Sequence, residues 1–171
     1  MSERQSLAGI AFRENGRVEP KELNALYRLI GWDSNDRRTD EETAEMLRVS
    51  HYYIAAHAAD GRLVGFARVA GDPYVAQVLD VFTHPDFRRR GIARRCAAGV
   101  LHHLQQSRYV SVTLTDDSRI HDFYQRFGFQ RLGEHVTTRA WRRGTEVVDS
   151  MTADSTRPPA PAREPGRPDR Q

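Results

Sequence analysis

The segment from Thr83 to Leu104, THPDFRRRGIARRCAAGVLHHL, constrains the fold of this chain more than any other stretch. From Ile92 onward, apolar residues recur at every fourth position, which predicts an amphipathic helix with one buried face. The run before it, YVAQVLDVFT, has the composition of a β-strand. A strand, an arginine-rich loop and a helix in direct succession indicate a sheet with a helix packed on it.

The start of this helix is suited to an anion. A helix that begins near Gly91 offers unpaired backbone N–H groups, and glycine has no side chain to keep a phosphate oxygen away. The surrounding cations are Arg88, Arg89, Arg90, Arg94 and Arg95. A diphosphate fits this pattern, and the alternative is an ordinary solvated surface. A Walker A loop is excluded because no Lys-Ser/Thr follows the glycine, and the three-glycine dinucleotide fingerprint is absent.

The chain has 171 residues, of which 39% are hydrophobic, and this length supports one globular core. We therefore predict a single domain over residues 1–150. The final stretch, STRPPAPAREPGRPDRQ, holds five of the eight prolines and lacks aromatic residues. Such a segment cannot bury enough apolar surface to offset its ordering entropy, so residues 155–171 are predicted to be a disordered tail rich in proline and arginine.

Composition also limits the compartment and the partners. The single cysteine, Cys96, allows neither a disulfide within the chain nor a cysteine-based zinc site, and we predict no metal. No apolar run is long enough for a membrane span, and no secretory signal is visible, so a cytoplasmic location without membrane association is expected. The net charge of +3 is modest for a nucleic-acid-binding protein, and the arginines lie in one loop, so no nucleic-acid partner is expected.

Hydrophobic periodicity and turn residues predict the remaining elements. Helices are expected over 18–32, 40–49 and 119–127, with Asp40 as the cap of the second. Strands are expected over 51–58, 63–70, 74–83, 109–115, 129–136 and 137–141, and the turns ADG and GDP join the first three of these as an antiparallel meander. With one more strand at the start, the predicted order is βααβββαβαββ, an α/β (α+β) fold with a mixed sheet and helices on its faces.

Two motifs resemble those of the GCN5-related N-acetyltransferases, the GNAT family. The segment LDVFTHPDFRRRGIARR resembles motif A, an Arg/Gln-x-x-Gly-x-Gly/Ala pattern after a strand, which here is Arg88-x-x-Gly91-x-Ala93. Downstream, IHDFYQRFGF resembles motif B, which ends in Phe-Tyr-x-x-x-Gly-Phe. The resemblance implies the GNAT fold, with a twisted and mostly antiparallel sheet, and an N-acetyltransferase that uses acetyl-CoA and no metal.

The resemblance also implies where acetyl-CoA binds. In this family the backbone of the fourth strand pairs with the pantetheine arm, and the amides at the start of the following helix receive the pyrophosphate. The matching residues of the strand are Val81, Phe82 and Thr83, and those of the loop and helix are Arg88, Arg89, Arg90, Gly91, Ile92, Ala93 and Arg94. The amide of Phe82 is a candidate for stabilising the oxyanion that forms at the thioester carbonyl.

Tyr124 matches the tyrosine of motif B that resembles a general acid for the departing CoA thiolate. The alternative is that it is an ordinary core aromatic, because Phe123 and other aromatic residues surround it in the sequence. Phe123 is itself expected to contact the cofactor. Many family members carry an asparagine ahead of motif B, and here Asp117 stands at that spacing, where a carboxylate cannot replace an amide donor.

The base that takes the proton of the amine has several candidates. Asp80 interrupts an apolar strand, and a carboxylate there is costly unless it is paired, hydrated or functional. Alternation places Asp80 on the face opposite Val81, together with Phe82. A structural ion pair with Arg68 is an equally good interpretation of Asp80, and a chain of water molecules could serve as the base instead.

The acceptor is the least constrained part of the prediction. The stretch ELNALYRLIGWD resembles a small arylalkylamine or serotonin-type branch of the family, in which Trp32 would form an aromatic wall for an amine. Trp32 could equally be a packing residue. The predicted acceptor is a small-molecule amine or a protein amine, at a lysine or at the N-terminus. A non-catalytic acetyl-CoA sensor is the alternative function, and a homodimer is left open.

Overall fold

The computed structural model describes residues 7–116 and 123–130, and these contain a five-stranded sheet. The strands lie side by side in chain order, as β1 (Ile10–Glu14), β2 (Tyr52–Ala58), β3 (Leu63–Gly71), β4 (Val75–Thr83) and β5 (Ser111–Thr113). Neighbours from β1 to β4 are antiparallel, and β5 runs parallel to β4. The parallel step follows from the helix that connects β4 to β5, because a parallel pair needs a long crossover.

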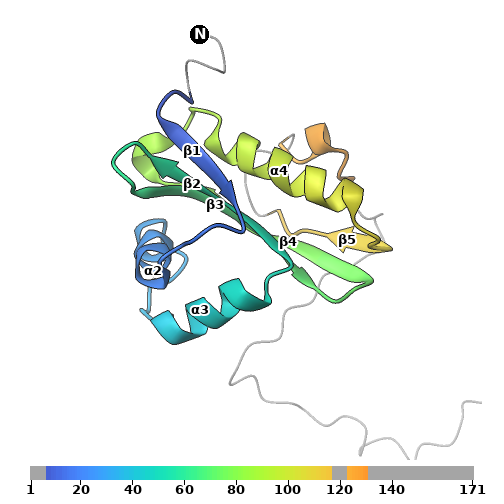
Figure 1. Cartoon of the computed structure of the whole chain (residues 1–171), viewed down its shortest axis with the longest axis horizontal. Coiled ribbons are helices and arrows are strands. Elements are labelled where there is room, and N and C mark those ends of the chain that lie inside the picture. The colour runs from blue at the N-terminus through green and yellow to red at the C-terminus, as the bar shows by residue number, and fades with distance from the viewer. Residues whose placement is uncertain (1–6, 117–122, 131–171) are drawn as a thin grey trace, which may run out of the picture. The chain divides into compact units, whose positions relative to one another are not determined.

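Helices cover both faces of the sheet (Figure 1). Helices α2 (Pro20–Leu29) and α3 (Asp40–Val49) lie on one face, and α4 (Ile92–Gln106) lies on the other. The apolar stripe of α4 packs through Ile92, Cys96 and Val100 into the core on its side, as its periodicity predicts. Thr39, and not Asp40 as expected, caps α3, since its Oγ1 accepts a hydrogen bond from the Glu42 N–H at 3.1 Å.

A bulge interrupts the pairing of β3 with β4. Phe66 pairs with Phe82 and Arg68 pairs with Leu79, so two residues of β4, Asp80 and Val81, stand opposite one residue of β3. Asp80 has a φ of 57°, in the left-handed region. The bulge shifts the alternation: Val81 packs with the cluster under α4, whereas Phe82 joins the cluster under α2.

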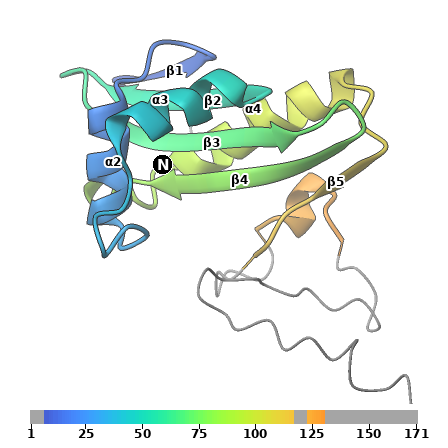
Figure 2. The same cartoon turned by 90° about the horizontal axis from the view of Figure 1, so that it is seen from below.

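Strand β4 separates from β5 after a short stretch of pairing. The parallel register covers only Val75–Gln77 and Ser111–Thr113, and β4 then continues alone along this edge to Thr83. Figure 2 shows β5 diverging from β4. Within the described residues, one edge of the second half of β4 is therefore left without a strand partner.

The loop between α2 and α3 is held by a buried carboxylate. Asp33 is 7% exposed, and its two oxygens accept the backbone N–H groups of Arg37 at 2.9 Å and Arg38 at 3.3 Å. The bond from Arg37 is the main reason that the pKa of Asp33 lies below its ordinary value, and burial opposes this shift. These bonds fix the path of the chain beside Trp32, at the C-terminal end of α2.

The predicted element order is confirmed from the first strand through β5. Of the helix predicted over 119–127, the structure describes a turn at Phe123 and Tyr124 and a short 3₁₀ helix at Gln125–Phe127. Most of the strand expected over 129–136 lies outside the described residues, which end at residue 130, and so does the whole strand expected over 137–141. The predicted domain boundary at 150 and the predicted tail at 155–171 also lie outside them. No helix in the described ranges is long and apolar enough to cross a membrane.

Gly65 offers a test of the packing between β3 and α4. A methyl group at residue 65 would overlap Cγ2 of Ile92 and would lie 3.4 Å from Cβ of Ala56. We expect Gly65→Ala to lower the free energy of unfolding, measured in urea, by about 1–3 kcal/mol. In an Ile92→Ala background the same substitution should cost less, because the overlapping carbon is gone. Equal costs in the two backgrounds would contradict this packing.

The Asp33 carboxylate predicts a pH-dependent difference in stability. Because the pKa of Asp33 is lowered in the folded chain, the stabilisation is present above the ordinary value of 3.8 and is lost as the pH falls through the folded value. Asp33→Asn should unfold at lower urea than the wild type near neutral pH, and the two should converge below pH 3.8. Asp36→Asn, at an exposed carboxylate of the same loop, is the matched control and should have little effect.

Candidate active site

A pocket of about 480 Å³ opens where β4 and β5 separate. Its lining comes from the second half of β4, from the chain after β5, from the α2–α3 loop and from the turn before the last 3₁₀ helix. The lining residues are Trp32, Arg38, Val78, Leu79, Asp80, Val81, Thr115, Asp116 and Tyr124. Four residues that the sequence analysis selected, Trp32, Asp80, Val81 and Tyr124, therefore meet around one cavity.

Asp80 lies in the wall of this pocket and is paired with Arg68. The Nε of Arg68 donates to Oδ2 of Asp80, and both side chains are largely buried, at 14% and 13% exposure. The bulge makes this pair, because it turns Asp80 to the face that carries Arg68 and Phe82. The ion pair considered from the sequence is thus present, and one carboxylate oxygen of Asp80 is already used as an acceptor.

Tyr27 lies beneath the same part of the pocket. Its ring is fully buried against Phe82, with centroids 5.1 Å apart and the rings at 67°. Its hydroxyl is buried and lies close to the Asp80 carboxylate. Burial first, and then the charge of the nearby Asp80, raise the pKa of Tyr27 far above its ordinary range, so this phenol stays protonated.

An aromatic and cationic wall closes the pocket on the side of the α2–α3 loop. Trp32 is 51% exposed and stands edge-on to Phe82, with centroids 5.4 Å apart and an angle of 85°. The guanidinium of Arg38 lies 3.6 Å above the Tyr27 ring, in cation–π geometry. Trp32 thus packs against Phe82 and also lines the pocket, with about half of its surface exposed.

Tyr124 enters the pocket from motif B. It is half-buried and lies edge-to-face with Phe123 at 4.9 Å and with Phe129 at 6.2 Å. These contacts fix the ring, and Thr115 and Asp116, at the end of the predicted strand 109–115 and directly after it, line the pocket together with it. Asp117, the position of the missing asparagine, lies outside the described residues.

The arginine loop leads into α4 as predicted. Arg89 and Gly91 have φ values of 60° and 87°, so the backbone reverses twice within three residues, and Gly91 is the N-cap residue of the helix. A Cβ at Gly91 would meet no atom within 4 Å, so the space over the first turn is open. Arg88, Arg89, Arg90 and Arg94 are exposed, whereas Ile92 is buried and Ala93 is half-buried. The Arg90 guanidinium lies 4.9 Å from the Phe87 ring.

The predicted residues thus fall into two groups. The pocket holds the side chains with catalytic chemistry, and the loop at the start of α4 holds the cations and open amides. Strand β4 joins them, since Val81 lines the pocket while Phe82 and Thr83 pair with Phe66 and Gly65 of β3 on the way to the loop. In the described ranges, no group of three or more His, Cys, Asp or Glu side chains could hold a metal.

Sequence reasoning missed Tyr27, Arg38 and Asp116. Tyr27 lies within the helix predicted over 18–32, and its proximity to Asp80 depends on the bulge, which has no sequence signal of its own. Arg38 lies in a loop whose path is set by Asp33. Asp116 directly follows the predicted strand 109–115, next to Asp117. Its position at the end of that strand is the sequence signal that could have identified it as a site residue.

Comparison with known proteins agrees with this geometry. A family model described as an acetyltransferase (GNAT) domain matches residues 31–146. The histone acetyltransferase TAP1 of Glycine max is 28% identical over 143 residues, which cover 77% of this chain and 61% of that protein. An uncharacterized N-acetyltransferase, ycf52, of Pyropia yezoensis is 26% identical, and the match covers 77% of this chain and 76% of that protein. The chain thus spans less than two thirds of the first relative.

The fold is shared with solved structures. A GNAT-family acetyltransferase of Streptococcus pneumoniae superposes with a TM-score of 0.64 at 24% identity, covering 79% of this chain and 98% of that chain.

A further sequence relative, a protein named serotonin N-acetyltransferase 2, chloroplastic, of Oryza sativa, is 24% identical, with 77% of this chain and 66% of that protein covered. The serotonin-type branch and the cytoplasmic location both stay predictions. Two motifs, the split between β4 and β5 and the match over residues 31–146 show that this chain belongs to the GNAT acetyltransferase family.

Proposed function

We propose that this protein transfers the acetyl group of acetyl-CoA to a primary amine in the pocket between β4 and β5. The observation that carries the proposal is that one cavity contains Tyr124, Asp80 and the unpaired edge of β4, and that this strand continues to the open N-terminus of α4. A thioester, an amine and two proton-transfer groups can therefore meet in one place.

The described residues fit acetyl-CoA along the second half of β4 and at the start of α4. The edge of β4 beside Val81 has backbone groups available to the amides of a pantetheine arm, in the manner of an added strand. The N–H groups of Ile92, Ala93 and Arg94 at the first turn of α4, with the side chains of Arg88, Arg89 and Arg90, suit a pyrophosphate. Acetyl-CoA supplies an acyl group already activated as a thioester.

The chain's own residues then manage two protons. The alkylammonium first loses a proton to Asp80, directly or through water, which frees the nitrogen lone pair. The nitrogen then attacks the thioester carbonyl carbon, a C–N bond forms, and the C–S bond breaks. Tyr124 gives its phenolic proton to the departing sulfur, and the second nitrogen proton returns through water to the Tyr124 phenolate. The Phe82 amide is the candidate donor to the oxyanion that precedes C–S cleavage. Asp80 retains acceptor sites for this role, because Arg68 occupies only one of its oxygens.

The acceptor in this proposal is an alkylammonium with an apolar body. The carboxylates of Asp80 and Asp116 lie in the pocket wall, and Trp32 offers an exposed aromatic face beside them. Names of relatives point both to protein and to arylalkylamine acceptors. A panel of arylalkylamines, polyamines, aminoglycosides and lysine peptides, assayed by release of free thiol from acetyl-CoA, identifies the class. Binding of acetyl-CoA with no thiol release from any amine would favour the non-catalytic sensor.

Tyr124→Phe tests the general acid. With the best amine of the panel, kcat should fall by about 10²-fold or more, because the thiolate must leave without its proton, while the KM for acetyl-CoA changes little. The matched control is Tyr74→Phe, which removes the same hydroxyl from an exposed tyrosine before β4. Unchanged kcat in Tyr124→Phe would reject the assignment of this residue.

A pair of substitutions at Gly91 tests the pyrophosphate site. Gly91→Ala and Gly91→Glu both force a side chain to adopt a φ of 87°, so they share the backbone strain, and only the second adds a negative charge at the helix start. We expect Gly91→Glu to abolish acetyl-CoA binding in calorimetry and Gly91→Ala to weaken it by about tenfold or less. Equal affinities for the two variants would place the pyrophosphate elsewhere.

A further inference from the structure

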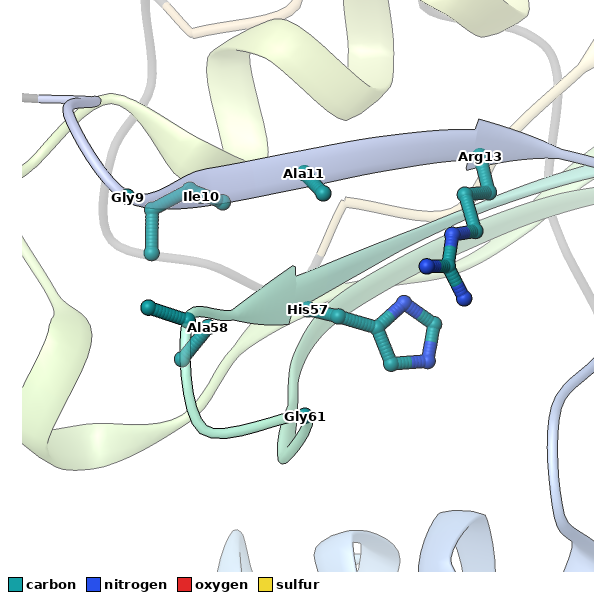
Figure 3. Close-up of a pocket in the computed structure, with 8 residues that line it drawn as sticks. Gly9, Ile10, Ala11, Arg13, His57, Ala58 and Gly61 are labelled. Carbon is teal, nitrogen blue, oxygen red and sulfur yellow. The ribbon is translucent and has the colours of Figure 1, made fainter.

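A second pocket, of about 420 Å³, lies at the opposite edge of the sheet. Figure 3 shows it between β1 and the turn that follows β2. Its lining residues are Gly9, Ile10, Ala11, Arg13, His57, Ala58, Ala59 and Gly61. Strand β3 separates β2 from β4, so this pocket shares no residue with the candidate active site.

His57 carries the unusual polar group of this pocket. The residue is 7% exposed, and its Nδ1 is buried with no hydrogen-bond partner in the described part of the chain. Burial lowers the pKa of His57 below 6.5, the Arg13 charge acts in the same direction, and Glu22 opposes them. The imidazole is therefore neutral at pH 7, and its buried Nδ1 lacks a partner in either tautomer; a ligand that accepts a hydrogen bond there selects the tautomer protonated at Nδ1.

Arg13 supplies a cation beside that donor. Figure 3 shows its guanidinium and the His57 imidazole pointing toward one another from neighbouring strands. Among the residues that the structure describes, no carboxylate pairs with Arg13, whereas Arg17, Arg28, Arg48, Arg62 and Arg68 each pair with one. Glu22, the acidic residue whose charge acts on His57, already accepts a hydrogen bond from the Leu63 N–H at 2.5 Å. A guanidinium fork beside a single N–H donor matches the two oxygens of a carboxylate.

The remaining walls are small and apolar. Ala11 and Ala59 are small, exposed residues, and Gly61 has no side chain, with no atom within 4 Å of where its Cβ would stand. Such walls offer no hydrogen bonds from side chains, so they suit a short hydrocarbon chain rather than the further oxygens of a phosphate.

We propose that this pocket binds a small aliphatic monocarboxylate. Its oxygens accept hydrogen bonds from the guanidinium of Arg13 and from Nδ1 of His57, and its hydrocarbon lies against Ala11 and Ala59. The ligand satisfies the buried imidazole nitrogen and neutralises the guanidinium in one step. This inference is independent of the proposed acetyl transfer, because no residue of the pocket takes part in it.

Nuclear magnetic resonance of the imidazole tests the proposal on the full chain. Sodium butyrate is titrated at pH 7 while the ¹H and ¹⁵N signals of His57, assigned by their loss in His57→Gln, are followed. A saturable shift is expected with butyrate and not with sodium chloride at equal concentration. Acetate should bind several-fold more weakly, since it buries less hydrocarbon. No assay of acetyl transfer enters this readout, so it fails or succeeds apart from the proposed function.

Charge-matched variants identify the contact. Arg13→Gln should weaken butyrate binding by about tenfold, because it removes the charged donor. Arg108→Gln removes the same charge from an exposed arginine beyond α4 and should leave the affinity unchanged. Absence of a saturable His57 shift, or equal affinities in the wild type and Arg13→Gln, would overturn the site. Tighter binding of sodium phosphate than of butyrate at His57 would overturn its assignment to a monocarboxylate.

Discussion

The separation of β4 from β5 is the feature on which the rest of the candidate active site depends. Parallel pairing ends after Val75–Gln77, so the backbone groups of the following residues of β4 face a pocket instead of a neighbouring strand. An unpaired edge inside a protein is costly unless something pairs with it. A ligand with peptide-like amides meets this requirement, and the bulge at Asp80 turns a carboxylate into the same space.

The two sides of the pocket are built by different kinds of structure. On the cofactor side, β4 and α4 are regular elements with buried contacts, and Ile92 packs against Gly65 so tightly that no methyl group fits between them. On the acceptor side, Trp32 and Arg38 belong to a loop, which is held by the Asp33 carboxylate and by stacking on Tyr27. Loops of this kind tolerate change more readily than strands, so the acceptor side can vary while the cofactor side is kept.

Most of the fold was predictable because its signals are local. The stripe of α4, the turns ADG and GDP and the arginine motif are short patterns, and they gave the strand order and the start of α4. The pairing of Asp80 with Arg68 depends on register, which the bulge shifts by one residue. Strict alternation of side chains from Val78 would put Asp80 on the face of the sheet that packs against α4. Alternation counted back from Val81 puts Asp80 on the opposite face, with Phe82, as in the structure. Tyr27 and Arg38 were missed because their neighbours are distant in the sequence.

Asp80 is paired with Arg68 and lies close to the buried phenol of Tyr27. A buried carboxylate needs partners, and Arg68 supplies the opposite charge, while Asp80 in turn lies close enough to Tyr27 to raise the pKa of that phenol. Because the phenol of Tyr27 stays protonated, it adds no negative charge beside Asp80. The pocket wall therefore carries the carboxyl groups of Asp80 and Asp116 together with the phenol of Tyr124. In the proposed reaction, one cavity thus supplies both the group that takes a proton from the amine and the group that gives one to the sulfur.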